Sequence, residues 1–119
     1  MTTRLNLIVI RVADIERSAR LFGTLGLHFK NEQHGKGPKH FSATIDGITL
    51  ELYPLQSKQQ ATNHARLGFL VDRGGLESVI AAWTLQGGTR VLPPNSSPWG
   101  LRAVLRDFDG HTVELTEPD

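Results

Sequence analysis

Two glutamates occupy the same position in a repeated seven-residue segment, and they are the first candidates for chemistry. The segment at 46–52, Asp-Gly-Ile-Thr-Leu-Glu-Leu, recurs at 109–115 as Asp-Gly-His-Thr-Val-Glu-Leu, with five of the seven residues identical. Carboxylates in such positions bind cations, pair with basic side chains or exchange protons. We therefore ask which parts of the chain position Glu51 and Glu114.

Strand periodicity predicts the direction in which both glutamates point. Apolar and polar residues alternate in each copy, as in a strand that buries one face. Leu50 and Leu52 are expected to pack on a helix, which leaves Glu51 and Tyr53 on the opposite face. The same alternation places Glu114 on the corresponding face of the second copy. That face could be a cleft wall, or it could simply be solvated.

Three basic side chains are expected to share this face. Arg66 lies in a second strand-like run and could hold Glu114 or Glu51 in a bidentate pair, unless it extends to solvent. His40 follows the polar set of its own strand, so it could bind a ligand or accept a proton. His64 lies two residues before Arg66 and is expected on the same side.

Other residues bear on a binding cleft less directly. Trp99 lies in a loop at 94–100, where we expect a mobile lid that could close over an apolar ligand. Arg102 and Arg106 alternate with apolar residues, and parity does not decide whether they face the cavity or water. The remaining histidines are expected to be structural or exposed: His28, His34 and His111.

The elements that position these residues repeat in the same order in both halves. The pattern predicts a strand, a helix and three strands in the first half, at 7–12, 14–26, 27–33, 39–46 and 48–54. The second half repeats this order at 66–71, 76–86, 89–93, 100–107 and 111–116. A tight Asp-Gly turn is expected in each copy of the repeat. A polar linker at about 56–64 separates module one, about 1–55, from module two, about 65–119.

This pair of β-α-β-β-β units resembles the glyoxalase / bleomycin-resistance / extradiol-dioxygenase superfamily, also called vicinal oxygen chelate proteins. The residues that carry the resemblance are 10–14, 16–18, 51–53, 68–72, 87–88 and 107–115. It spans essentially the whole chain and implies an α+β fold. Two β-α-β-β-β modules would form a cupped mixed sheet with helices on the outer face. The resemblance also implies a homodimer in which modules of two chains complete each cleft.

The resemblance further implies where a metal would bind. In metal-using members of the superfamily, four side chains hold one divalent ion inside the cup. These ligand positions map onto Leu7, Glu51, Arg66 and Glu114. Leu7 has no donor atom and Arg66 cannot lose its proton to become a ligand. Because two carboxylates alone suit zinc, nickel or iron poorly, we expect no metal cofactor, with Arg66 as counter-charge. If a metal is present, Glu51 and Glu114 are its expected ligands.

The expected function is therefore the binding of an apolar or cationic small molecule. The cleft would be lined by His40, Glu51, Tyr53, Arg66, Trp99 and Glu114. The alternative is a divalent-metal-dependent lyase, isomerase or dioxygenase in which His40 or His64 replaces the missing ligands. A metal-free enzyme with a glutamate as general base and Arg66 as electrostatic stabiliser is a third hypothesis.

Composition excludes several other classes of protein. The chain has 119 residues, a formal net charge of +1 and no cysteine. The charge gives no basis for nucleic-acid binding, and the missing thiols exclude disulfides and thiolate metal sites. No apolar run reaches the roughly 18 residues of a membrane helix, and the N-terminus lacks a signal-peptide pattern. We expect a cytoplasmic protein that binds neither membranes nor nucleic acids.

Overall fold

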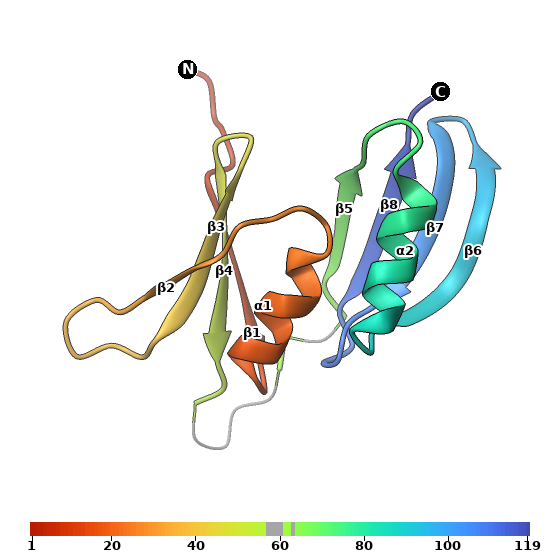
Figure 1. Ribbon diagram of the computed structural model, residues 1–119. Coiled ribbons are helices and arrows are strands. Elements are labelled where there is room, and N and C mark those ends of the chain that lie inside the picture. The colour runs from red at the N-terminus through yellow and green to blue at the C-terminus, as the bar shows by residue number, and fades with distance from the viewer. Residues whose placement is uncertain (57–60, 63) are drawn as a thin grey trace. The chain divides into compact units, whose positions relative to one another are not determined.

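The computed structural model describes residues 1–56, 61–62 and 64–119, which form eight strands and two helices (Figure 1). The first half contains β1 (Leu7–Val12), α1 (Ile15–Gly23), β2 (Lys30–Glu32), β3 (His40–Ile45) and β4 (Ile48–Pro54). The second half contains β5 (Arg66–Leu70), α2 (Leu76–Leu85), β6 (Thr89–Ser97), β7 (Gly100–Arg106) and β8 (Thr112–Glu117). The predicted α+β fold with two β-α-β-β-β modules is confirmed.

The chain divides into two units, Met1–Ala61 and Thr62–Asp119, which we call the first and second modules. Each module has its own four-stranded mixed sheet, so the predicted mixed sheet is present as two sheets. Residues 57–60 and 63 of the predicted linker lie outside the described residues.

Both sheets have the same topology, and this places the two glutamates alike. The strand orders are β1-β4-β3-β2 and β5-β8-β7-β6. The first and last strands of each module pair in parallel, and the remaining neighbours are antiparallel. Parallel pairing requires a long crossover connection between the two strands, and the helix of each module lies in that connection. The glutamate-bearing strands β4 and β8 are therefore internal, with a neighbour on either side.

In the first module, α1 covers one face of the sheet. Asp14 caps this helix by accepting a hydrogen bond from the Arg17 backbone N–H at 3.1 Å. Leu21 and Phe22 are fully buried, and so are the sheet residues that face the helix, Leu50 and Leu52 among them. The strand parity predicted for β4 is therefore confirmed. Burying each such side chain contributes roughly 1.5–3 kcal/mol.

In the second module, α2 is anchored to its sheet by Trp83. The ring is fully buried, and its Nε1–H donates to the Arg106 carbonyl at 3.3 Å. A Cβ atom at position 88 would collide with this indole, so Gly88 is required by close packing. Within the described residues, neither helix combines the length and apolar character that a membrane crossing needs.

The two copies of the Asp-Gly repeat form different turns, so the expectation of two tight turns is half wrong. Asp46 and Gly47 have φ values of 48° and 78° and join β3 to β4 in a two-residue turn. The second copy forms a five-residue turn between β7 and β8. There the buried Asp107 carboxylate accepts hydrogen bonds from two backbone N–H groups, those of Asp109 at 3.0 Å and His111 at 2.7 Å. These bonds hold the longer turn.

Strand β6 also differs from the prediction, because it continues through the proline pair to Ser97. Its register against β7 shifts between Arg90 and Leu92 and again between Leu92 and Asn95, so irregular pairing accommodates both prolines. The loop expected at 94–100 is reduced to the two residues between β6 and β7.

Candidate functional site

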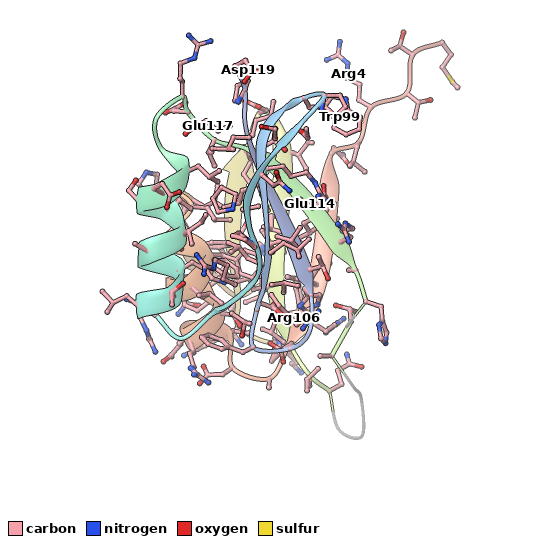
Figure 2. All side chains as sticks on the ribbon, turned by 90° about the vertical axis from the view of Figure 1, so that its right-hand side faces the viewer. Arg4, Trp99, Arg106, Glu114, Glu117 and Asp119 are labelled. Carbon is pink, nitrogen blue, oxygen red and sulfur yellow. The ribbon has the colours of Figure 1, made fainter. Side chains whose placement is uncertain are left out.

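We call the sheet face opposite the helix of each module its open face, and the predicted site residues other than Trp99 lie there. In the second module, Arg66 forms an ion pair with Glu114, one of the two glutamates considered as its partner. A second guanidinium, that of Arg102, donates from Nη2 to Glu114 Oε1 and from Nε to Oε2, the latter at 3.3 Å. Glu114, labelled on β8 in Figure 2, is therefore held between two arginines on the strands that flank it.

These contacts determine the charge of the cluster. The hydrogen bond from Arg102, supported by that from Arg66, holds the pKa of Glu114 below its ordinary value, although burial acts in the opposite direction. The same hydrogen bond raises the pKa of Arg102. Glu114 is thus ionised at neutral pH, and the cluster of one carboxylate and two guanidinium groups carries a net charge of +1.

In the first module, Glu51 faces a histidine instead. His40 Nε2 lies 3.3 Å from Glu51 Oε2 and 3.7 Å from Glu32 Oε1. The His40 side chain is only 1% exposed, and its Nδ1 lies 3.2 Å from the Pro38 carbonyl oxygen. A carbonyl oxygen can only accept, so Nδ1 carries the proton that it donates to Pro38. The Nε2 atom is then the one directed at the carboxylates.

Tyr53 completes this part of the open face. The His40 ring stacks on the Tyr53 ring with centroids 4.3 Å apart and an interplanar angle of 8°. The Arg11 guanidinium carbon lies 4.9 Å from the centroid of the Tyr53 ring, within cation–π range. His40, Glu51 and Tyr53 are thus brought together, as strand parity predicted.

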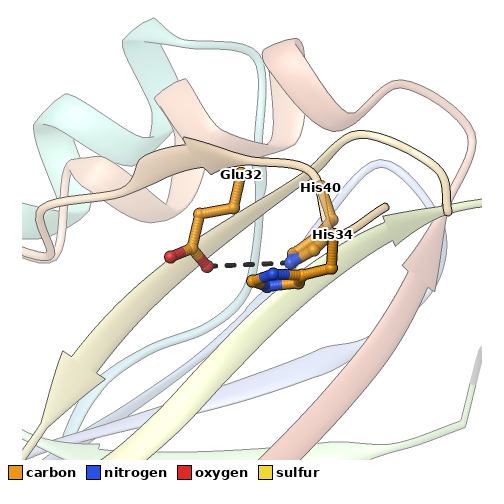
Figure 3. Close-up of side chains that lie close together, drawn as sticks. All are labelled: Glu32, His34 and His40. Atoms are coloured by element: carbon orange, nitrogen blue, oxygen red, sulfur yellow. Dashed lines mark ion pairs between the residues drawn. The ribbon is translucent and has the colours of Figure 1, made fainter. Parts of the chain in front are cut away.

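The hairpin between β2 and β3 adds two residues that the sequence analysis did not select. Ligand atoms of Glu32, His34 and His40 all lie within 4.8 Å of one another (Figure 3). Glu32 and His40 are paired across the antiparallel ladder, and the exposed His34 follows where the chain turns. The turn is closed by the Gly37 backbone N–H, which donates to the His34 carbonyl at 3.0 Å. The cluster follows from the pairing register of this hairpin, which alternation in the sequence does not give.

A second group of suitable residue types has a structural role. Ligand atoms of Asp107, Asp109 and His111 also lie within 4.8 Å of one another. His111 is fully buried, its Nδ1 contacts Asp107 Oδ2 at 2.6 Å, and its Nε2 contacts Thr62 Oγ1 at 2.9 Å. Both ring nitrogens are therefore engaged, one by Asp107 of the turn and one by Thr62, and the expectation that His111 is structural is met.

Two further predicted residues lie apart from these clusters. Trp99 is 73% exposed at the tip of the β6–β7 hairpin, and its backbone N–H donates to Ser97 Oγ at 3.2 Å (Figure 2). His64 has a φ of 69° and precedes β5, so strand parity does not extend to it. Strand parity therefore gives no support for the prediction that His64 shares a face with Arg66.

A small cavity lies beside Arg102. It measures about 190 Å³ and is formed by Arg102 and the irregular part of β6 from Leu92 to Ser97. Ligand pockets usually measure roughly 300–1,000 Å³, so this cavity can hold one substituent of a ligand rather than a whole molecule.

The residues at the superfamily's metal positions fit a metal poorly. Leu7 offers only hydrocarbon, and Arg66 is a permanent cation that contacts Glu114. Arg66 and Arg102 together already satisfy both oxygens of the Glu114 carboxylate. Of the four positions, Glu51 alone presents a carboxylate that no arginine contacts among the described residues.

Comparison with known proteins agrees with this architecture. The family model described as "Glyoxalase/Bleomycin resistance protein/Dioxygenase superfamily" matches residues 4–115. No curated protein gave a significant match.

Similar solved structures include an oxidase, ChaP-H2, with a TM-score of 0.79 and 24% identity over 99% of this chain and 96% of that one. A glyoxalase/bleomycin resistance protein from Albidiferax ferrireducens has a TM-score of 0.77 and 24% identity over 97% and 98%. TnmS3, an antibiotic binding protein from a Streptomyces species, has a TM-score of 0.73 and 21% identity over 99% and 98%. At these identities the likeness establishes the fold alone. The chain belongs to the glyoxalase/bleomycin resistance protein/dioxygenase superfamily.

Proposed function

We propose that this chain binds a small organic molecule without using a metal at the positions where the superfamily holds one. The observation that carries the proposal is the environment of Glu114, whose carboxylate is bonded by two guanidinium groups. An incoming cation would have to displace both arginines and would then leave them close together without their counter-charge. The ion-paired cluster takes the place of a metal as the charged feature of the second module.

The surroundings of this cluster support a ligand with an apolar body and an oxygen acceptor. Leu92 and the two prolines after it line the cavity beside Arg102. A guanidinium has five N–H donors, and Arg102 directs two of its nitrogens at Glu114. The net charge of the cluster favours an acceptor or an anion over the cationic ligand that the sequence alone allowed. The name of the family and the likeness to TnmS3, an antibiotic binding protein, support an antibiotic as one such ligand.

The enzyme alternatives are less well supported. A lyase, isomerase or dioxygenase of this superfamily would need His40 or His64 to replace Leu7 and Arg66 as metal ligands beside Glu51 and Glu114. Both oxygens of Glu114 are already bonded by arginines. A metal-free enzyme would need a glutamate that can take up a proton. Glu114 is poorly suited to that role because its two arginines stabilise the ionised form.

Calorimetric titration of chelator-treated protein with a panel of small neutral and anionic antibiotics that carry oxygen acceptors tests this proposal. We expect saturable binding without metal, weakened in Arg102→Met and unchanged in Arg73→Met, which removes an exposed arginine from the turn before α2. Trp99→Phe tests the predicted lid. The substitution should change the affinity for the ligand and leave the stability of the protein unchanged. A ligand that binds only after divalent metal is added would contradict the proposal.

We also propose a homodimer, as the resemblance implied. The edge strands β1 and β5 expose apolar side chains, with Leu7 at 48% and Leu70 at 77%. Edges of this kind are usually covered in an assembled protein. Light scattering coupled to size exclusion should give twice the 13.1 kDa chain mass. A monomer at micromolar concentration would contradict the homodimer.

A further inference from the structure

We propose that the β2–β3 hairpin of the first module binds a zinc ion through Glu32, His34 and His40, with Glu51 beside it. This site differs from the superfamily's metal positions, because three of its residues lie on β2, on β3 and in the turn between them. It does not depend on the ligand proposed above, since the cluster around Glu114 lies in the other module.

The first argument is the state of His40. Its Nδ1 carries a proton donated to Pro38, so a neutral ring has only a lone pair at Nε2. That lone pair faces carboxylate oxygens of Glu51 and Glu32, which are themselves acceptors. Among the described residues, none forms a hydrogen bond with Nε2, although the atom is buried. Nε2 therefore needs a partner among these groups, and a bound cation would satisfy its lone pair and the carboxylate oxygens together.

The second argument is the spacing of the donor atoms. A tetrahedral zinc ion with bonds of about 2.0–2.1 Å separates its ligand atoms by about 3.4 Å. The distances from Nε2 to the two glutamates are 3.3 and 3.7 Å, and all three donors of the hairpin cluster lie within 4.8 Å of one another. Small rotations of exposed His34 can complete such a site. The His34 ring already contacts the His40 ring, with centroids 5.2 Å apart and an interplanar angle of 39°, so the two imidazoles are close enough to share one ion.

The third argument is the set of contacts that fix the orientation of His40, the central ligand. Histidines that bind metals usually donate their other ring N–H to a backbone carbonyl or carboxylate, which fixes the orientation of the ring. His40 does this through Pro38, and Tyr53 stacks against its ring. Two imidazoles with carboxylates are a donor set that zinc favours, whereas calcium and magnesium prefer oxygen ligands alone.

Zinc titration of the whole chain, produced without a histidine tag and stripped with chelator, tests the site. We expect one zinc ion per chain by calorimetry in a non-chelating buffer. His34→Gln should weaken zinc affinity by more than about tenfold, and Glu32→Gln and His40→Gln should do the same. Because His34 is exposed, its variant should fold normally even if the substitution at buried His40 destabilises the protein.

Matched controls separate this site from adventitious surface binding. His28→Gln and Glu16→Gln alter exposed residues of the same module outside the cluster and should leave zinc affinity unchanged. Absence of zinc binding by the wild-type protein would overturn the proposal. Binding that survives His34→Gln, or is lost equally in His28→Gln, would overturn it as well. None of these results affects metal-free ligand binding, so the two proposals fail independently.

Discussion

The two modules are built alike, yet they surround the same glutamate of the repeat with different side chains. In the second module, Glu114 is paired across the sheet with Gly68 of β5 and Val104 of β7. Two residues earlier on each of those strands stand Arg66 and Arg102. These diagonal neighbours lie on the same face and within reach of long side chains, and both arginines bond Glu114.

The first module has the same pairing with different occupants. Glu51 is paired with one residue of β1 and one of β3. The positions two residues earlier hold Leu7 and His40, which correspond to Arg66 and Arg102. A hydrocarbon and an imidazole cannot neutralise a carboxylate as two permanent cations do. The comparison shows that the same strand pairing can surround one glutamate with arginines and leave the other available to a cation.

The largest expected effect that sharpens this comparison is on stability. Glu114→Gln should lower the free energy of unfolding by about 2 kcal/mol, because it leaves two guanidinium groups near each other without their carboxylate. Glu51→Gln, the matched change in the other module, should alter metal-free stability by less than about 0.5 kcal/mol. Urea unfolding of both variants at neutral pH measures the difference. Equal losses would show that the two glutamates have equivalent environments.

A smaller effect should distinguish the two arginines. Arg102 bonds both oxygens of Glu114 and is 28% exposed, whereas Arg66 is 53% exposed. Double-mutant cycles with Glu114 should give a coupling energy of about 1 kcal/mol for Arg102 and about 0.5 kcal/mol or less for Arg66. A larger coupling to Arg66 would mean that Arg66 is the principal counter-charge.

The smallest effect is a change in pH dependence. Because the folded-state pKa of Glu114 is lowered, its stabilising contribution is complete above the unfolded-state pKa and is lost as pH falls through the folded-state pKa. The stability difference between wild type and Glu114→Gln should therefore be constant near neutrality and shrink between about pH 5 and pH 3. Urea midpoints across this range provide the measurement. A difference that grows on acidification would reverse the sign of our assignment.

Local alternation predicted the order of the strands and helices and one ion pair of the charged clusters, whereas the fold followed from the resemblance to the superfamily. The repeat around Glu51 and Glu114 indicated alternating strands, and parity placed Arg66 on the face of Glu114. The face to which Arg102 points was left undecided, because parity divides a strand into two sets of residues without saying which set is buried. Ala103 and Leu105 are in fact fully buried, which puts Arg102 on the open face.

The hairpin cluster depended on information that alternation does not contain. Glu32 and His34 become neighbours of His40 only through the register of β2 against β3 and the turn at 34–37. Register across a turn with two glycines depends on backbone conformations with positive φ, such as the 57° of Gly35. Similarly, β6 continued through two prolines because irregular pairing accommodated them, which no local rule predicted.

The most direct test of the contrast between the modules is a set of thermal melts of wild type, Glu51→Gln and Glu114→Gln, each with and without zinc. We predict that zinc raises the melting temperature of wild type and Glu114→Gln by the same amount and that of Glu51→Gln by less. Without zinc, Glu114→Gln should melt lowest, by several degrees. If Glu114→Gln instead abolishes the zinc-dependent rise, the metal binds at the superfamily's positions and our account of the two glutamates is wrong.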